Sequence, residues 1–190
     1  MTITKQDASQ ALGEIEGARV RLREAIAYGY AWPYLVLWGL AWMVGDLGTE
    51  IAPPRLVGWI WPAASAVFTC ASIAYAVVQQ RRSPYAAGRR GDWRPIATAA
   101  TIMLFLVILT FAIEPVDAKR DHSVFGLFFG FAYIVQGLWR GWRLVALGAL
   151  LTVLTLFAFY ALPLWGGYLT FMGLVGGGAL VLGGLWLRKL

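Results

Sequence analysis

Cysteine, histidine and asparagine are almost missing from this 190-residue chain, which has one Cys (Cys70), one His (His122) and no Asn. A single cysteine excludes an intrachain disulfide and the paired-cysteine metal motifs. A single histidine excludes bis-histidine haem ligation and the His-x-x-x-His zinc motif, and neither a Gly-x-Ser-x-Gly elbow nor a phosphate-binding loop occurs. The sequence therefore predicts no cofactor, no catalytic residues and a protein that is not an enzyme.

Long apolar runs are abundant instead. The chain is 59% apolar, and six runs lie at about 27–47, 57–79, 97–114, 123–139, 144–162 and 164–187. Each is about as long as a membrane-spanning helix, and none carries a charge away from its ends. One or two such runs fit a soluble core, but six in succession do not. We therefore expect an all-α integral membrane protein with a six-transmembrane-helix bundle over residues 27–190.

Basic residues are unequally divided between the two ends of these predicted helices. Thirteen of the sixteen Lys and Arg residues lie in the N-terminal segment, the second and fourth loops and the C-terminus. Only Arg55, Lys119 and Arg120 lie in the alternate loops. This positive-inside pattern predicts that both termini are cytoplasmic. The net charge of +6 then indicates anionic lipid headgroups rather than nucleic acid as the partner.

Tryptophans agree with these boundaries, because eight of the ten fall at predicted helix ends, where the amphipathic indole prefers the headgroup level. The N-terminal segment lacks the short apolar core of a cleaved signal peptide, so we expect the first span to be an uncleaved anchor. Small size, short loops and an Ala/Gly/Leu/Arg-rich composition favour the bacterial inner membrane.

The segment 1–26 is predicted to be a cytoplasmic amphipathic helix. Leu12, Ile15, Leu22 and Ile26 recur at heptad-like spacing, with Arg19 interrupting the stripe. One interpretation is a helix lying along the inner headgroups. The other is a docking surface for a cytoplasmic protein or for a second copy of the chain. The mixed charge of the polar face favours docking, since interfacial helices usually have a uniformly basic one.

Aromatic residues recur every four positions along the first predicted span. The series Tyr30, Tyr34, Trp38, Trp42 and Asp46 forms a slowly drifting stripe on one helix face. An indole N–H at mid-membrane depth needs a partner, so the stripe is expected to face protein or a cavity. It either packs against neighbouring helices or lines a site for an apolar or cationic ligand. Pro33 is expected near the start of this helix, where proline is tolerated.

Polar groups within the predicted spans are few. Gln136 is the only amide well inside one, and it joins the stripe residues as a ligand-binding candidate. The third loop gathers four groups that are weak candidates for a divalent cation: Glu114, Asp117, Asp121 and His122. The alternative is a solvated turn balanced by Lys119 and Arg120. Ion-coupled carriers usually place charged residues inside the bundle, so their absence here weighs against coupled transport.

Glycines spaced by four occur in the fourth and sixth predicted helices. Gly126 and Gly130, and likewise Gly173 and Gly177, allow helix backbones to approach closely. We expect these two helices to pair with each other or one of them to form an oligomer interface.

The pattern as a whole predicts a membrane protein that regulates, anchors or assembles a partner, or acts as a small membrane sensor. The alternative is a small transporter or channel subunit for an apolar or cationic solute along the aromatic stripe. The sequence does not decide which ligand or partner is bound.

Overall fold

The computed structural model describes residues 5–82, 101, 104–105, 108 and 118–189, and the elements it describes are all helical. The long helices are α1 (Lys5–Ile51), α2 (Pro54–Arg82), α4 (Ala118–Arg140) and α5 (Trp142–Ala161). The last apolar run consists of shorter pieces, η2 (Leu164–Tyr168), α6 (Leu169–Phe171), η3 (Met172–Gly176) and α7 (Gly177–Arg188). The second, fourth, fifth and sixth predicted spans match these bounds to within a few residues.

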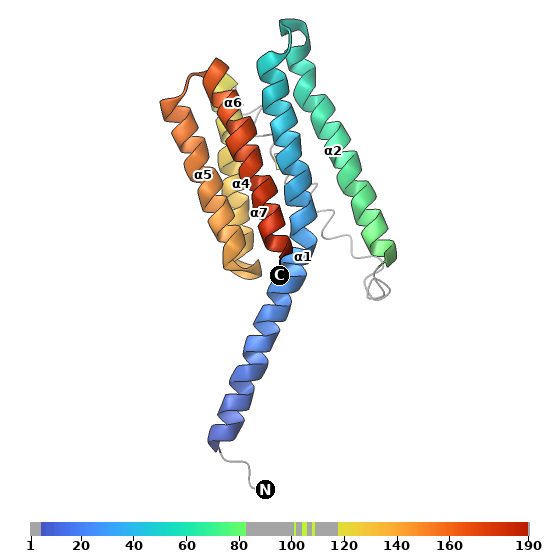
Figure 1. Ribbon diagram of the computed structural model, residues 1–190, viewed down its shortest axis with the longest axis vertical. Coiled ribbons are helices and arrows are strands. Elements are labelled where there is room, and N and C mark those ends of the chain that lie inside the picture. The colour runs from blue at the N-terminus through green and yellow to red at the C-terminus, as the bar shows by residue number, and fades with distance from the viewer. Residues whose placement is uncertain (1–4, 83–100, 102–103, 106–107, 109–117, 190) are drawn as a thin grey trace.

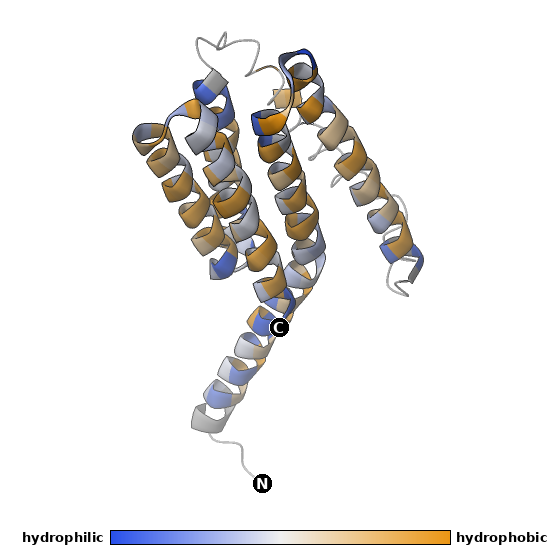
Figure 2. Ribbon diagram, turned by 45° about the horizontal axis from the view of Figure 1, so that its top comes forward, coloured by the Kyte–Doolittle hydropathy of each residue, from blue (hydrophilic) through white to orange (hydrophobic). Residues whose placement is uncertain are grey.

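Four helical segments of the described chain are long and apolar enough to cross a membrane: Pro54–Gln79, Lys119–Arg140, Trp142–Ala161 and Leu164–Arg188. Their outward faces carry exposed apolar side chains such as Val67, Val153 and Leu182, each more than 60% exposed. Hydrophobic residues dominate these helices, and hydrophilic ones collect at helix ends and in the N-terminal part of α1 (Figure 2). Such a surface suits lipid rather than water. These features are those of a multi-pass membrane protein.

The two remaining predicted spans, 27–47 and 97–114, are not among these four segments. Residues 27–47 lie within α1, which is not among those four segments, because its Tyr, Trp and Pro residues and Asp46 lower its mean hydropathy. The range 97–114 lies outside the described residues except for Thr101, Leu104, Phe105 and Ile108, which are helical. The count of six spans therefore stays a prediction.

Helix α1 joins the predicted N-terminal helix to the first span without interruption. It has 47 residues and is about 70 Å long at the usual helical rise. Its N-terminal half extends beyond the bundle, and the helix changes direction where it enters the bundle (Figure 1). Pro33 lies well inside α1, so the expectation that it stands near a helix start is wrong. Proline cannot donate to the carbonyl four residues back, which favours a bend.

The helices pack as two close pairs, α4 with α5 and α1 with α7, while α2 packs mainly against α1 (Figure 1). The buried core lies between the pairs and includes Tyr28, Leu35, Trp42, Leu144, Leu151, Tyr168, Met172 and Leu180. The polar members of this core are few, and several of them gather at one end of the bundle. That end contains the candidate site.

The predicted packing glycines lie at these close contacts, but with different partners from those expected. A Cβ atom on Gly130 would collide with Thr152 of α5, and one on Gly177 would lie 2.8 Å from the carbonyl oxygen of Gly39 in α1. Gly126 and Gly173 face Thr155 of α5 and Leu47 of α1 in the same way. Pairing of the fourth helix with the sixth is therefore wrong in the described chain, because each of them packs on another helix.

Candidate functional site

The α1–α2 turn, the start of α4 and the η2 turn lie at the same end of the bundle (Figure 1). A group of polar and aromatic side chains lies there. We call it the end cluster. It consists of Asp46 and Glu50 from α1, Trp61 from α2, His122 and Ser123 from α4 and Tyr168 from η2. Four different helical elements thus supply the residues of one small region.

Asp46 and His122 form the centre of the end cluster. Asp46 Oδ1 lies 3.3 Å from His122 Nδ1, and the side chains are 1% and 20% exposed. A buried carboxylate is costly unless a positive or hydrogen-bonding group compensates it. The two atoms are within ion-pair distance but are not aligned as a hydrogen bond, so Asp46 Oδ1 has no hydrogen-bond partner among the described residues. The contact ties α1 to α4 and depends on the protonation of the imidazole.

Aromatic rings enclose this imidazole on two sides. The ring centroids of Trp61 and Tyr168 lie 6.0 Å and 6.5 Å from that of His122. Ser123 Oγ lies 2.7 Å from the Lys119 carbonyl oxygen and 3.1 Å from Tyr168 Oη. A hydroxyl has one hydrogen, and a carbonyl can only accept, so Ser123 donates to Lys119 and accepts from Tyr168. This orientation fixes the Tyr168 ring beside His122.

The neighbouring turn is held by Glu50, one helical turn beyond Asp46 on the same face of α1. The backbone N–H of Gly166 donates to Glu50 Oε1 at 2.5 Å. Gly166 has a φ of 71°, a left-handed conformation that glycine adopts without steric cost. Lys119 Nζ donates to the Leu162 carbonyl oxygen and lies over the Phe159 ring. These contacts fasten the η2 turn against α1 and α4.

Three buried polar atoms of the end cluster lack hydrogen-bond partners among the described residues: Asp46 Oδ1, Glu50 Oε2 and Trp61 Nε1. Buried unsatisfied groups are uncommon and each needs an explanation, for which function is one. Next to them η3 has a widened helical turn, where Gly173 packs against Asp46 and Leu47. Such turns frequently occur at functional sites. The unpartnered carboxylate oxygens of Asp46 and Glu50 can accept N–H groups of a small ligand.

The aromatic stripe of α1 does not face a single neighbour. Tyr34 meets Tyr75 of α2 edge to face at 5.8 Å, whereas Trp42 meets Phe129 of α4 at 6.1 Å. Trp38 is half-buried, and Tyr30 is 49% exposed. Steps of four residues rotate a helix position by about 40° each, so the stripe turns from α2 towards α4 along its length. Its C-terminal half therefore packs against α4 and ends at the buried Asp46.

The other predicted site residues do not lie together in one site. Gln136 Oε1 accepts a hydrogen bond of 2.8 Å from Arg140 Nη1 on its own helix, far along α4 from the end cluster. Of the candidate cation ligands, His122 pairs with Asp46, and Asp121 lies in the first turn of α4, where a negative charge is favourable. The other two, Glu114 and Asp117, lie outside the described residues. Within the described chain, no three His, Cys, Asp or Glu residues are grouped as a metal site requires.

Sequence reasoning found Asp46 and His122 separately but did not join them. It placed both residues at the same predicted membrane face, and this shared position was the one sequence feature that pointed to a contact between them. Their pairing depends on α1 lying beside α4, which nothing in either helix specifies. Trp61, Ser123 and Tyr168 were not predicted, because aromatic and hydroxyl residues are common in apolar helices.

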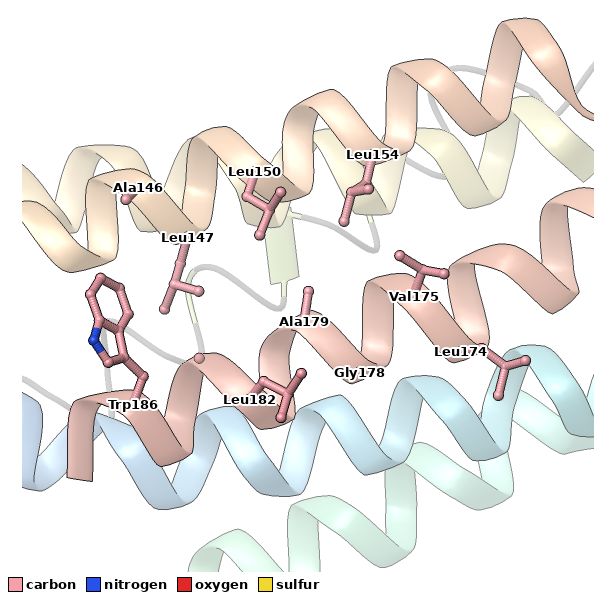
Figure 3. Close-up of a pocket in the computed structure, with 11 residues that line it drawn as sticks. Ala146, Leu147, Leu150, Leu154, Leu174, Val175, Gly178, Ala179, Leu182 and Trp186 are labelled. Atoms are coloured by element: carbon pink, nitrogen blue, oxygen red, sulfur yellow. The ribbon is translucent and has the colours of Figure 1, made fainter. Parts of the chain in front are cut away.

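An apolar groove of about 520 Å³ lies between α5 and α7 (Figure 3). Leu150, Leu154, Leu182 and Trp186 line it, and its other described lining residues are also apolar or glycine. The Trp186 indole N–H is the one polar side-chain group among these described lining residues, so the groove suits a lipid chain rather than a specific ligand.

Comparison with known proteins gives no match: no family model, curated protein or solved structure matches this chain. Its function has to be argued from the helices and the side chains themselves.

Proposed function

We propose that this chain is a six-span bacterial inner-membrane protein, with both termini cytoplasmic, that anchors or assembles a partner protein through the projecting half of α1. In this proposal the chain is not an enzyme. The observation that carries it is the continuity of α1: one helix of 47 residues runs from the bundle out beyond it (Figure 1).

The apolar stripe on the projecting half is uncovered. Leu12, Ile15, Leu22 and Ile26 are each between 51% and 66% exposed. Four large apolar side chains along one face of a helix are the pattern that an amphipathic partner helix recognises. A helix that continues from its span and projects away from the bundle (Figure 1) does not lie flat in the headgroups, which supports docking over interfacial binding.

Arg19 indicates the chemistry of the partner. It lies within the stripe, between Ile15 and Leu22, and its side chain is exposed. A partner helix with apolar residues and one carboxylate facing Arg19 would complement this stripe. A second copy in the same membrane would run parallel and bring two Arg19 side chains together, which is unfavourable. The proposed occupant is therefore an amphipathic helix of a different, cytoplasmic protein.

The transporter alternative has less support. It requires the aromatic stripe to line a solute path, but Trp42 is 7% exposed and Asp46 is 1% exposed against α4. No residue of the aromatic stripe lines the groove between α5 and α7 or the groove beside the α4–α5 turn.

Capture of a cytoplasmic partner from native membranes tests the proposal. The Leu12→Ser/Ile15→Ser/Leu22→Ser variant should lose the co-purifying protein, identified by mass spectrometry, while the bundle stays folded. The matched control is Gln10→Ser/Glu14→Ser on the opposite face, which should retain it; Gln10 donates to Glu14 at 3.2 Å and both are exposed. Equal capture by the stripe variant and the wild-type chain would refute partner docking.

A further inference from the structure

A second groove lies at the opposite end of the bundle from the end cluster, between α1 and the turn that joins α4 to α5. It has a volume of about 410 Å³. Val20, Arg23 and Glu24 of α1 form one wall, and residues 137–142 with Val145 form the other. The groove thus connects the projecting half of α1 with the membrane-spanning bundle.

The local charge of this groove is positive. Arg23 and Arg140 both line it and both are exposed, against one lining carboxylate, Glu24. No ion pair joins either arginine to a carboxylate within the described residues. Arg140 donates one hydrogen bond, from Nη1 to Gln136 Oε1. The remaining guanidinium donors suit the paired oxygens of a phosphate.

The start of α5 adds to this preference. Its N-cap is Gly141, which lines the groove, has a φ of 131° and offers no side chain to cap the first N–H groups. A Cβ atom at Gly141 would collide with the Tyr28 hydroxyl, so this position has to be glycine and carries no capping side chain. Uncapped N–H groups at a helix start favour an anion.

Apolar and aromatic residues set the depth of the groove in the membrane. Trp139 and Trp142 are 80% and 61% exposed and stand at the ends of two candidate spans. Exposed indoles at span ends lie at headgroup level, where lipid phosphates also lie. Val20, Leu138 and Val145 line the groove as well and offer a surface to the upper part of an acyl chain. A free phosphate ion would gain nothing from these apolar walls.

We propose that this groove binds the headgroup of an anionic phospholipid, with its phosphate between Arg23 and Arg140. The bound lipid bridges α1 to the α4–α5 turn and braces the projecting half of α1 against the bundle. This site can be tested separately from partner docking, because purified protein without the partner suffices to occupy it.

Native mass spectrometry of the purified full-length chain, titrated with phosphatidylglycerol or phosphatidylcholine, tests this inference. Phosphatidylglycerol should bind more tightly, and Arg23→Gln/Arg140→Gln should weaken its first binding step roughly tenfold. The matched control, Arg21→Gln/Arg120→Gln, removes the same charge outside the groove and should leave that step unchanged. Arg23→Lys/Arg140→Lys keeps the charge and should lose only part of the affinity, even if the glutamine variant folds poorly.

Two results would overturn the proposal. Equal weakening in the groove variant and the control would mean attraction by net charge alone. Displacement of phosphatidylglycerol by millimolar inorganic phosphate would mean that the groove binds a phosphate ion and not a lipid.

Discussion

At the scale of single residues, the Asp46–His122 contact is the feature of the described chain that should tolerate substitution least. A carboxylate that is 1% exposed has His122 as its compensating neighbour, 3.3 Å away. Removing one member of a buried pair leaves the other without compensation, which costs more than the pair itself contributes. The contact should therefore show strong coupling when the two residues are changed together.

His122→Ala should lower the stability of the bundle by about 1–3 kcal/mol, because it leaves the buried Asp46 carboxyl group without its neighbour. Asp46→Asn combined with His122→Ala should restore part of that loss, giving a coupling energy well above the error of a double-mutant cycle. Thermal unfolding in mild detergent, followed by circular dichroism, measures both. Additive losses would show that the two side chains do not interact; Asp121→Asn on the same helix turn serves as the control.

At the scale of elements, adjacent glycines of α7 behave differently because one faces a helix and the other does not. A Cβ atom on Gly177 would lie 2.7 Å from Met43 Cγ, whereas one on Gly178 has nothing within 4 Å. The helix pair α1–α7 therefore depends on position 177 and not on position 178.

Gly177→Ala should destabilise the protein, since the added methyl forces the α1 and α7 backbones apart. Gly178→Ala should be neutral or stabilising by about 0.5–1 kcal/mol, because alanine favours the helix. The same unfolding measurement on both variants decides this. Equal effects of the two substitutions would mean that α7 does not pack on α1 at this point.

The elements also show what the sequence could and could not predict. The lengths of α2, α4 and α5 follow from apolar runs between charged ends, and the exposed stripe at Leu12 and Ile15 follows from helical periodicity. The choice of neighbours does not follow, because any apolar helix with a Gly face can pack on any other. Gly130 and Gly177 were recognised as packing residues for this reason, yet their partners and the Asp46–His122 pair were not.

At the scale of the whole molecule, charge and structure divide the bundle into two unlike ends. One end holds the end cluster, and the other holds the arginine-lined groove and the projecting half of α1 (Figure 1). The positive-inside pattern predicts that the second end is cytoplasmic.

Cysteine labelling with a membrane-impermeant reagent, in a Cys70→Ser background, tests this orientation. Arg55→Cys, at the start of α2, should label from outside intact cells. Gln10→Cys should label only in inside-out vesicles. The reverse pattern would invert the predicted topology and place the groove and the α1 stripe outside the cell.

The accessibility of the α1 stripe in native membranes tests partner docking, the central proposal, most directly. In inside-out native membranes, Ile15→Cys and Leu22→Cys should label slowly, because a partner helix covers them, while Glu14→Cys labels quickly. After purification and reconstitution into lipid vesicles without the partner, all three positions should label at the same fast rate. Protection of positions 15 and 22 in both preparations would contradict the account, because it would mean that the helix lies on the bilayer and docks no protein.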